Sequence, residues 1–205
     1  MRVLGPTEAF YKNLLPGYRG TPEPKAGLTF AFGQLVEKAK ETVKKIAENW
    51  GHETLDDTGE TSAENNSSAI ILFTIGEDSL LFTSDAGIPA LSEAVGRLHA
   101  DGFDFSKLKF VQVPHHGSKR NIGPTLLNTL IGPKTSQPTR IKTAFASVSP
   151  EGAPKHPAKK VTNAFLRRGA PVHVTAGSTK LHYRNAPGRG WINSTPLPFY
   201  NEVEE

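Results

Sequence analysis

Apolar positions beyond residue 68 alternate between the period of a strand and the period of a helix. Short apolar runs that predict strands occur at 69–75, 80–83, 111–113, 141–148, 172–175 and 180–183. Helical spacing predicts helices from Pro89, over 124–130 and over 157–168, the last ended by Gly169. Strands that alternate with helices indicate an α/β layered fold.

The first third of the chain has a different pattern. Residues 5–27 are rich in proline, glycine and aromatic residues and predict an irregular loop. A long amphipathic helix is predicted next, with apolar residues at Phe32, Leu35, Val36, Ala39, Val43, Ile46, Ala47 and Trp50. Residues 51–68 are polar and predict a mobile loop. Residues 1–4 read as a strand with no strand partner nearby, which favours a fragment or a split half of a domain.

These patterns divide the chain into three parts. Residues 1–64 lead into the domain, residues 65–190 form it, and residues 191–205 are a tail. The 205 residues, 37% of them apolar, suffice for one globular core. The chain has no apolar run long enough to cross a membrane and no signal peptide. It also lacks cysteine, so a cytoplasmic protein is expected.

Charge is distributed unevenly along the chain. Residues 1–118 hold 11 Lys/Arg against 16 Asp/Glu, whereas residues 119–200 hold 13 Lys/Arg and a single carboxylate, Glu151. The basic residues expected near a site are Lys119, Arg120, Arg140, Lys142, Lys155, Lys159, Lys160, Arg167 and Arg168. They favour a phosphate-containing substrate such as DNA over the alternative of a solvated basic surface.

A pair of histidines ends the strand at 111–113. Pro114 cannot donate a ladder hydrogen bond, so the strand stops there and the pair His115-His116 lies at its tip. Gly117 allows a sharp turn, and imidazole is the commonest metal ligand. A capped strand with one solvated histidine is the alternative interpretation of this pair.

Two further polar residues follow strands. Asp85 comes after the run 80–83, where a carboxylate can bind a cation or serve as an N-cap or turn residue. His156 follows the run 141–148 and precedes Pro157, where it is either a site residue or part of a helix entrance. The three polar tips are predicted to converge.

Five segments, in this order, resemble the second half of hydrolases with the metallo-β-lactamase fold. They are Asn65-Asn66-Ser67-Ser68, the run 69–75, Phe82-Thr83-Ser84-Asp85, Val113-Pro114-His115-His116-Gly117-Ser118 and Lys155-His156-Pro157. The closest resemblance is to the hydrolase domain of ComEC-type DNA-uptake proteins and their soluble relatives. Ser84 and Lys155 stand where that family has glycine, which leaves less room for close backbone approach.

The resemblance implies an α/β fold that is the second half of an αββα sandwich, and metal-assisted hydrolysis of phosphodiester bonds. Asp85 would bridge two zinc or manganese ions. His115 would be a second metal ligand, or His116 would take this place instead. His116 and His156 would act in catalysis or bind the other ion. Ser118, Lys119 and the Asn65-Asn66 pair would orient phosphate oxygens.

One expected element is missing. The first half of such hydrolases carries a His-x-His-x-Asp-His motif that supplies most metal ligands, and this chain has none; His52 is the only histidine before His99. Either a second polypeptide or a removed N-terminal half completes the fold, or the protein has lost hydrolysis. In the latter case it is a non-catalytic module that binds nucleic acid or completes a partner. A related hydrolase acting on a phosphorylated lipid or cell-wall headgroup is a third class.

Overall fold

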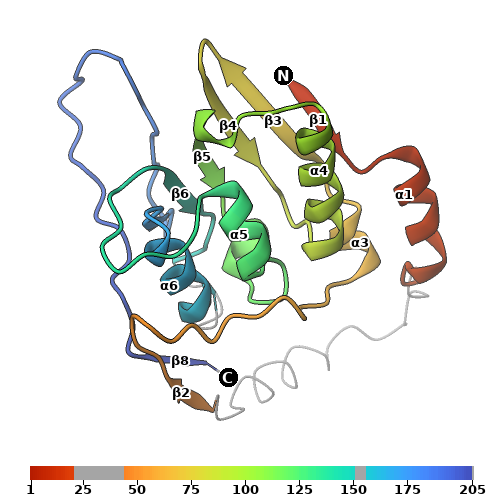
Figure 1. Cartoon of the computed structure of the whole chain (residues 1–205), viewed down its shortest axis with the longest axis horizontal. Helices are drawn as coiled ribbons and strands as arrows, with labels where there is room; N and C mark the ends of the chain where they lie inside the picture. The colour runs from red at the N-terminus through yellow and green to blue at the C-terminus, as the bar shows by residue number, and fades with distance from the viewer. Residues whose placement is uncertain (21–43, 151–155, 205) are drawn as a thin grey trace, which may run out of the picture.

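The computed structural model describes residues 1–20, 44–150 and 156–204, and it confirms an α/β protein (Figure 1). Six strands form a mixed sheet in the order β1-β3-β4-β5-β6-β7. Their bounds are β1 Arg2–Gly5, β3 Ile70–Ile75, β4 Asp78–Phe82, β5 Leu108–Gln112, β6 Thr143–Ala146 and β7 Val172–Val174. A two-stranded sheet pairs β2 (Lys45–Ala47) with β8 (Glu202–Glu204).

The helices lie mainly on one face of the six-stranded sheet. Their bounds are α1 Glu8–Leu14, α3 Ala63–Asn66, α4 Ile88–Ala100, α5 Pro124–Leu130 and α6 Lys159–Arg167. Strands β4 to β7 are parallel and adjacent in chain order, and α4, α5 and α6 connect them. Since such crossovers are right-handed, a sheet that grows in one direction places all three helices on the same face, as Figure 1 shows.

The hydrophobic core lies between this face and the helices. Leu72, Leu81, Val111, Ala144 and Val172 are neighbours across five strands, and all are buried. Helix α4 covers them with the face predicted from its spacing, Leu91, Val95 and Leu98. The predicted helices at 124–130 and 157–168 are confirmed, although α6 starts at Lys159.

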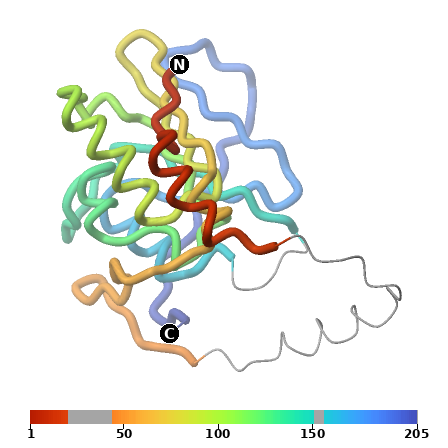
Figure 2. Tube along the Cα trace, turned by 90° about the vertical axis from the view of Figure 1, so that its right-hand side faces the viewer, coloured from red at the N-terminus to blue at the C-terminus, as the bar shows by residue number. Residues whose placement is uncertain are grey.

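The opposite face of the sheet is apolar and only partly covered. On β3 and β4 it exposes Phe73, Ile75 and Phe82, with exposed fractions of 40%, 64% and 37%. On β5 to β7 the segment after β7 covers it, where the ring of His182 lies 5.3 Å from that of Phe110. In Figure 2 this blue segment and the green helices lie on opposite sides of the sheet.

The first twenty residues differ from the prediction. The strand at 1–4 does have a partner, because β1 pairs antiparallel with β3 at the edge of the sheet. The predicted irregular loop contains helix α1, whose N-cap Thr7 accepts a hydrogen bond from the N–H of Phe10. Pro6 and Pro16 flank this helix without interrupting it, which is why a proline-rich composition was misleading. Residues 21–27 of that loop lie outside the described residues.

Two other predicted elements are wrong. The long helix was expected to continue to Trp50, yet Lys45–Ala47 is strand β2; residues 32–43 of that helix lie outside the described residues. No strand forms at 180–183, where the chain runs irregularly over the sheet with Leu181 and Tyr183 half exposed. The predicted loop 51–68 includes the short helix α3.

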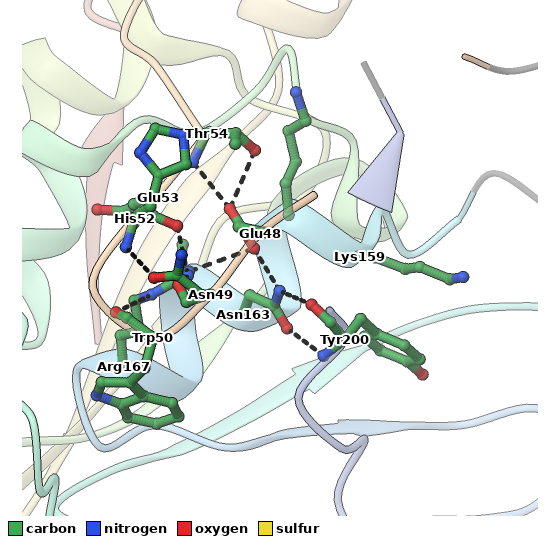
Figure 3. Close-up of polar contacts among 12 residues, drawn as sticks. Glu48, Asn49, Trp50, His52, Glu53, Thr54, Lys159, Asn163, Arg167 and Tyr200 are labelled. Atoms are coloured by element: carbon green, nitrogen blue, oxygen red, sulfur yellow. Dashed lines mark hydrogen bonds and ion pairs between the residues drawn. The ribbon is translucent and has the colours of Figure 1, made fainter. Parts of the chain in front are cut away.

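Helix α6 is tied to residues 48–54 by buried polar contacts (Figure 3). Glu48 and Arg167 form an ion pair of 3.4 Å in which both side chains are fully buried. The Arg167 guanidinium also donates to the carbonyl oxygens of Trp50, at 3.0 Å, and His52, at 2.9 Å. Asn163 donates to Glu48 and to the carbonyl oxygen of Tyr200, and so joins the C-terminal segment to the same cluster.

Within the described residues, no helix is both long and apolar enough to cross a membrane.

Candidate functional site

The predicted site residues come together at the carboxyl ends of the parallel strands. Asp85 follows β4, His115 follows β5 and His156 follows β6, and parallel strands that lie side by side end at one edge of the sheet. The Nδ1 atom of His115 lies 3.5 Å from the Oδ1 atom of Asp85. The rings of His115 and His156 have centroids 6.1 Å apart. The three groups, remote in the sequence, therefore share one region.

An unusual backbone conformation carries the two histidines. His115, His116 and Gly117 have φ values of 44°, 58° and 87°, all in the left-handed region that glycine favours. The turn is held by the N–H of His115, which donates to the carbonyl oxygen of Ser84 at 3.0 Å. Strained non-glycine backbone concentrates at functional sites, so this turn supports a functional interpretation of the motif.

Gly117 brings the loop of His156 close to this turn. A Cβ atom at Gly117 would lie 2.5 Å from the Cβ of Pro157 and 2.9 Å from its Cα, so only glycine fits there. The N–H of Ala158 donates to the carbonyl oxygen of Gly117 at 2.9 Å. These contacts fix His156 beside the histidine pair.

Two amide side chains position the loop of Asp85. The Oε1 atom of Gln112 accepts hydrogen bonds from the N–H groups of Thr83 and Ser84, at 3.0 and 3.1 Å. The buried Asn121 donates from Nδ2 to the carbonyl oxygen of Asp85 at 2.9 Å. The N-cap of α4 is Gly87, so the alternative of Asp85 as an N-cap is wrong. Its carboxylate is 45% exposed and is directed toward His115.

A hydrogen bond to the backbone fixes the orientation of the His116 ring. The Nδ1 atom lies 2.6 Å from the carbonyl oxygen of Ser147, in the loop after β6. A carbonyl only accepts, so Nδ1 carries the proton and Nε2 keeps the lone pair of the neutral ring. His116 is exposed, and Nε2 is the atom that it can offer to a metal or a proton.

A cavity of about 750 Å³ lies beside these groups. Of the predicted residues it is lined by Asn65, His115, Ser118, Lys119 and His156. The Asn65 side chain donates to the hydroxyl of Thr61 at 2.6 Å. Asn66 is buried, and its Oδ1 atom would clash with a Cβ at Gly87. Asn66 therefore packs against Gly87 and is not among the residues that line the cavity.

Sequence reasoning missed part of the lining. Arg19, Glu60, Asn121 and Glu204 line the cavity, and all but Asn121 come from segments outside the motifs. The Glu204 carboxylate accepts from the N–H groups of Lys159 and Lys160, both at 3.2 Å. A sequence motif cannot predict a residue such as Glu204, which a strand distant in the sequence brings to the site. Asn121 lies only three residues after Ser118, so it could have been considered together with the histidine motif.

The basic half of the chain only partly surrounds the site. Lys119 and Arg120 line both this cavity and an adjoining one that Lys160 also lines. Burial and the positive charge of Lys119 lower the pKa of Lys160. Arg167 is in the buried cluster of Figure 3, and Arg168 pairs with Glu53 at 2.6 Å. Those two arginines are structural, contrary to the expectation.

Asp85 and His115 fit part of a metal centre. Zinc lies about 2 Å from nitrogen and oxygen ligands, so two such atoms 3.5 Å apart can bind one ion. The Nδ1 atom of His115 is buried and has no hydrogen-bond partner among the described residues. In the described part of the chain, however, no three His, Asp or Glu residues are arranged to hold a metal. A catalytic zinc needs about three protein ligands, so the set is incomplete.

No model of a protein family matches the chain, and neither the curated proteins nor the solved structures that were compared with it include a match.

Proposed function

We propose that the chain is the C-terminal half of a metal-dependent hydrolase with the metallo-β-lactamase fold, which cleaves phosphodiester bonds once a complementary half is present. The observation that carries this proposal is the meeting of Asp85 and His115 at 3.5 Å beside the cavity that His156 lines. A sheet with helices on one face and an apolar opposite face is what one half of an αββα sandwich requires.

The metal chemistry is shared with the complementary half in this proposal. Asp85 and His115 would provide two ligands, and a second polypeptide or an N-terminal segment would provide the others. Zinc or manganese held there would act as a Lewis acid that activates water for attack on phosphorus. Because the described ligand set is incomplete, hydrolysis by this chain alone is not expected.

The chain's own residues would bind and orient the phosphate. Lys119 and Arg120 give one wall of the cavity a positive charge, and Ser118 and Asn65 add polar groups able to contact phosphate oxygens. His156 lies close enough to His115 to protonate a leaving oxygen near the metal ligands. A nucleic acid or a nucleotide is the proposed substrate.

Zinc titration calorimetry of the chain assembled with its complementary half tests the ligand assignment. Asp85→Ala and His115→Ala should each weaken zinc binding at least about tenfold, since each removes one of two adjacent ligands. His99→Gln, which changes an exposed histidine on α4, should leave binding unchanged. The assignment fails if wild-type protein binds no zinc or if all three variants bind it equally.

The catalytic part needs the assembled protein. The chain, tagged in its own host and purified with whatever accompanies it, should hydrolyse bis-p-nitrophenyl phosphate in the presence of zinc or manganese. Asp85→Ala should abolish this activity. A wild-type assembly that binds metal but never cleaves the substrate would overturn the hydrolase proposal.

A second candidate is a non-catalytic module that binds nucleic acid. The incomplete ligand set and the cluster of Lys119, Arg120 and Lys160 favour it. Such a module should bind DNA without metal, with an affinity that falls steeply as salt increases. Metal-independent binding that Asp85→Ala leaves intact, together with absent hydrolysis, would distinguish it from the enzyme.

A further inference from the structure

A second cavity, of about 480 Å³, lies on the sheet face opposite the helices. Strands β5 to β7 form its floor, and the irregular segment after β7 forms its roof, with His182 at its edge. It shares no lining residue with the cavity beside Asp85 and His115. Its volume is in the range of sites for small molecules.

The charge of this cavity is positive. The described residues that line it include Lys109, Arg140, Lys142 and Arg184, and none of them is a carboxylate. Arg184 is paired with Asp78 at 2.7 Å, and the Nζ atom of Lys142 donates to the carbonyl oxygen of Phe105 at 2.9 Å. Lys142 is also buried, at 6% exposed, so Arg140 and Lys109 are the accessible cations left for a ligand.

The hydrogen-bond acceptors of these two cations are neutral. Arg140 donates to the hydroxyl of Thr143 at 3.3 Å, and Lys109 donates to the carbonyl oxygen of Ser106 at 2.6 Å. Neither forms an ion pair within the described part of the chain. An anionic ligand would supply the missing negative charge.

The cavity also contains a buried histidine, His173, whose ring nitrogens lack hydrogen-bond partners among the described residues. It is 3% exposed and lines the cavity. Burial, together with the positive charge of Arg140, lowers the pKa of His173, so the ring is neutral at pH 7. A neutral imidazole has one donor and one acceptor, and leaving both unpaired in a buried position is costly.

Aromatic side chains form another part of the cavity lining. Phe145, His182 and Tyr183 line the cavity, and the ring of Phe145 lies 5.7 Å from that of His173. Aromatic walls favour a planar ring such as a nucleobase, and either ring nitrogen of His173 can form one hydrogen bond with a polar atom at the edge of that base.

We propose that this cavity binds a nucleotide unit, with the phosphate held by Arg140 and Lys109 and the edge of the base hydrogen-bonded to His173. The source of the unit is either a free mononucleotide or one residue of a single strand. This site does not depend on the proposed hydrolase function, because it uses none of the same residues.

Binding is measured by calorimetry with adenosine 5′-monophosphate, inorganic phosphate, adenosine and a short single-stranded oligonucleotide as probes. The monophosphate should bind more tightly than phosphate or adenosine, since only it engages both halves of the site. Stronger binding of the oligonucleotide would identify the polymer as the source. The proposal is overturned if neither the monophosphate nor the oligonucleotide binds.

Variants locate the site. Arg140→Gln and His173→Phe should each weaken binding at least about tenfold, whereas Lys12→Gln, an exposed cation on α1, should not change it. Equal affinity in all variants would place the ligand elsewhere and reject the proposal. His115→Ala should leave this binding intact even if it abolishes zinc binding.

If a variant fails to fold, nuclear magnetic resonance of the histidine rings in the wild-type protein tests the proposal instead. In wild-type protein, the ring nitrogens of His173 should shift during titration with the nucleotide, and those of His99 should not. Unchanged His173 signals at saturation would also reject the proposal.

Discussion

At the scale of single residues, backbone geometry decides where the candidate chemistry lies. His115 and His116 have left-handed φ values that a side chain tolerates poorly, and Gly117 completes the turn where no side chain fits. The sequence motifs predicted histidines at a strand tip that meets Asp85 and His156, and the structure adds the distances: 3.5 Å from His115 Nδ1 to Asp85 Oδ1, and 6.1 Å between the rings of His115 and His156. Contacts such as those of Gln112 and Asn121 with the Asp85 loop were not predictable, because amide side chains have no pattern in a sequence.

Gly117→Ala should destabilise the protein by roughly 1–3 kcal/mol, the cost of strained backbone, and the clash with Pro157 adds to it. Urea unfolding measures the change. Gly96→Ala is the matched control: Gly96 is exposed in α4 and has open space around its Cβ position, so alanine should stabilise by about 0.5–1 kcal/mol. A Gly117 variant as stable as wild type would show that the turn relaxes freely.

Lys142 gives a residue-scale prediction for pH. Burial lowers the pKa of Lys142 from 10.5 to about 8. Between these two values the folded chain has released a proton that the unfolded chain keeps, so the contribution of Lys142 to stability increases as pH rises from about 8 to about 10.5.

Urea unfolding near the two ends of this window tests the shift. Wild-type protein should gain more stability with rising pH than Lys142→Met, in which the titrating group is absent. Equal slopes for the two proteins would mean that the carbonyl oxygens of Phe105 and Leu130 keep the ammonium charged despite its burial.

At the scale of elements, the prediction was correct where apolar residues recur with a clear period, and wrong where contacts with distant segments decide the conformation. Helices α4 and α5 and strands β3 to β7 follow from apolar spacing, because each buries the face that the spacing defines. Strand β2 was predicted as helix: Ile46 fits a helical pattern, but its pairing with Val203, at the far end of the chain, decides its conformation. Tertiary pairing of this kind overrides local propensity.

The buried pair of Glu48 and Arg167 fixes residues 48–54 on α6. Glu48→Ala should destabilise the protein by about 3–5 kcal/mol, because it leaves the Arg167 guanidinium buried without a counter-charge. Chemical unfolding is again the measurement. Glu77→Ala, which removes an exposed partner of Lys107, should change stability far less, because water screens this surface pair. Similar small losses in both variants would mean that water reaches Arg167.

At the scale of the whole molecule, the sheet has two unequal faces. Helices cover one face fully, while the other leaves Phe73, Ile75 and Phe82 exposed at the end formed by β3 and β4. The apolar runs of these strands were visible in the sequence, but which apolar residues stay uncovered depends on how far the segment after β7 extends. An exposed patch of this kind promotes association.

The chain should therefore self-associate as its concentration increases. Replacing Phe73 and Ile75 together by threonine should keep the strand, since threonine is β-branched, and should shift the protein toward monomer. Sedimentation velocity over a range of concentrations measures this shift. Ile192→Thr, at a residue that is 97% exposed and lies outside β3 and β4, is the control. Wild-type protein that stays monomeric throughout would contradict the prediction.

The approach of Gly117 to Pro157 also has a meaning for evolution. Two loops far apart in the gene touch where neither has spare volume, and the left-handed φ of Gly117 excludes a side chain there as well. Across an alignment of homologous sequences, glycine should therefore be invariant at position 117, and any residue larger than proline should be rare at position 157.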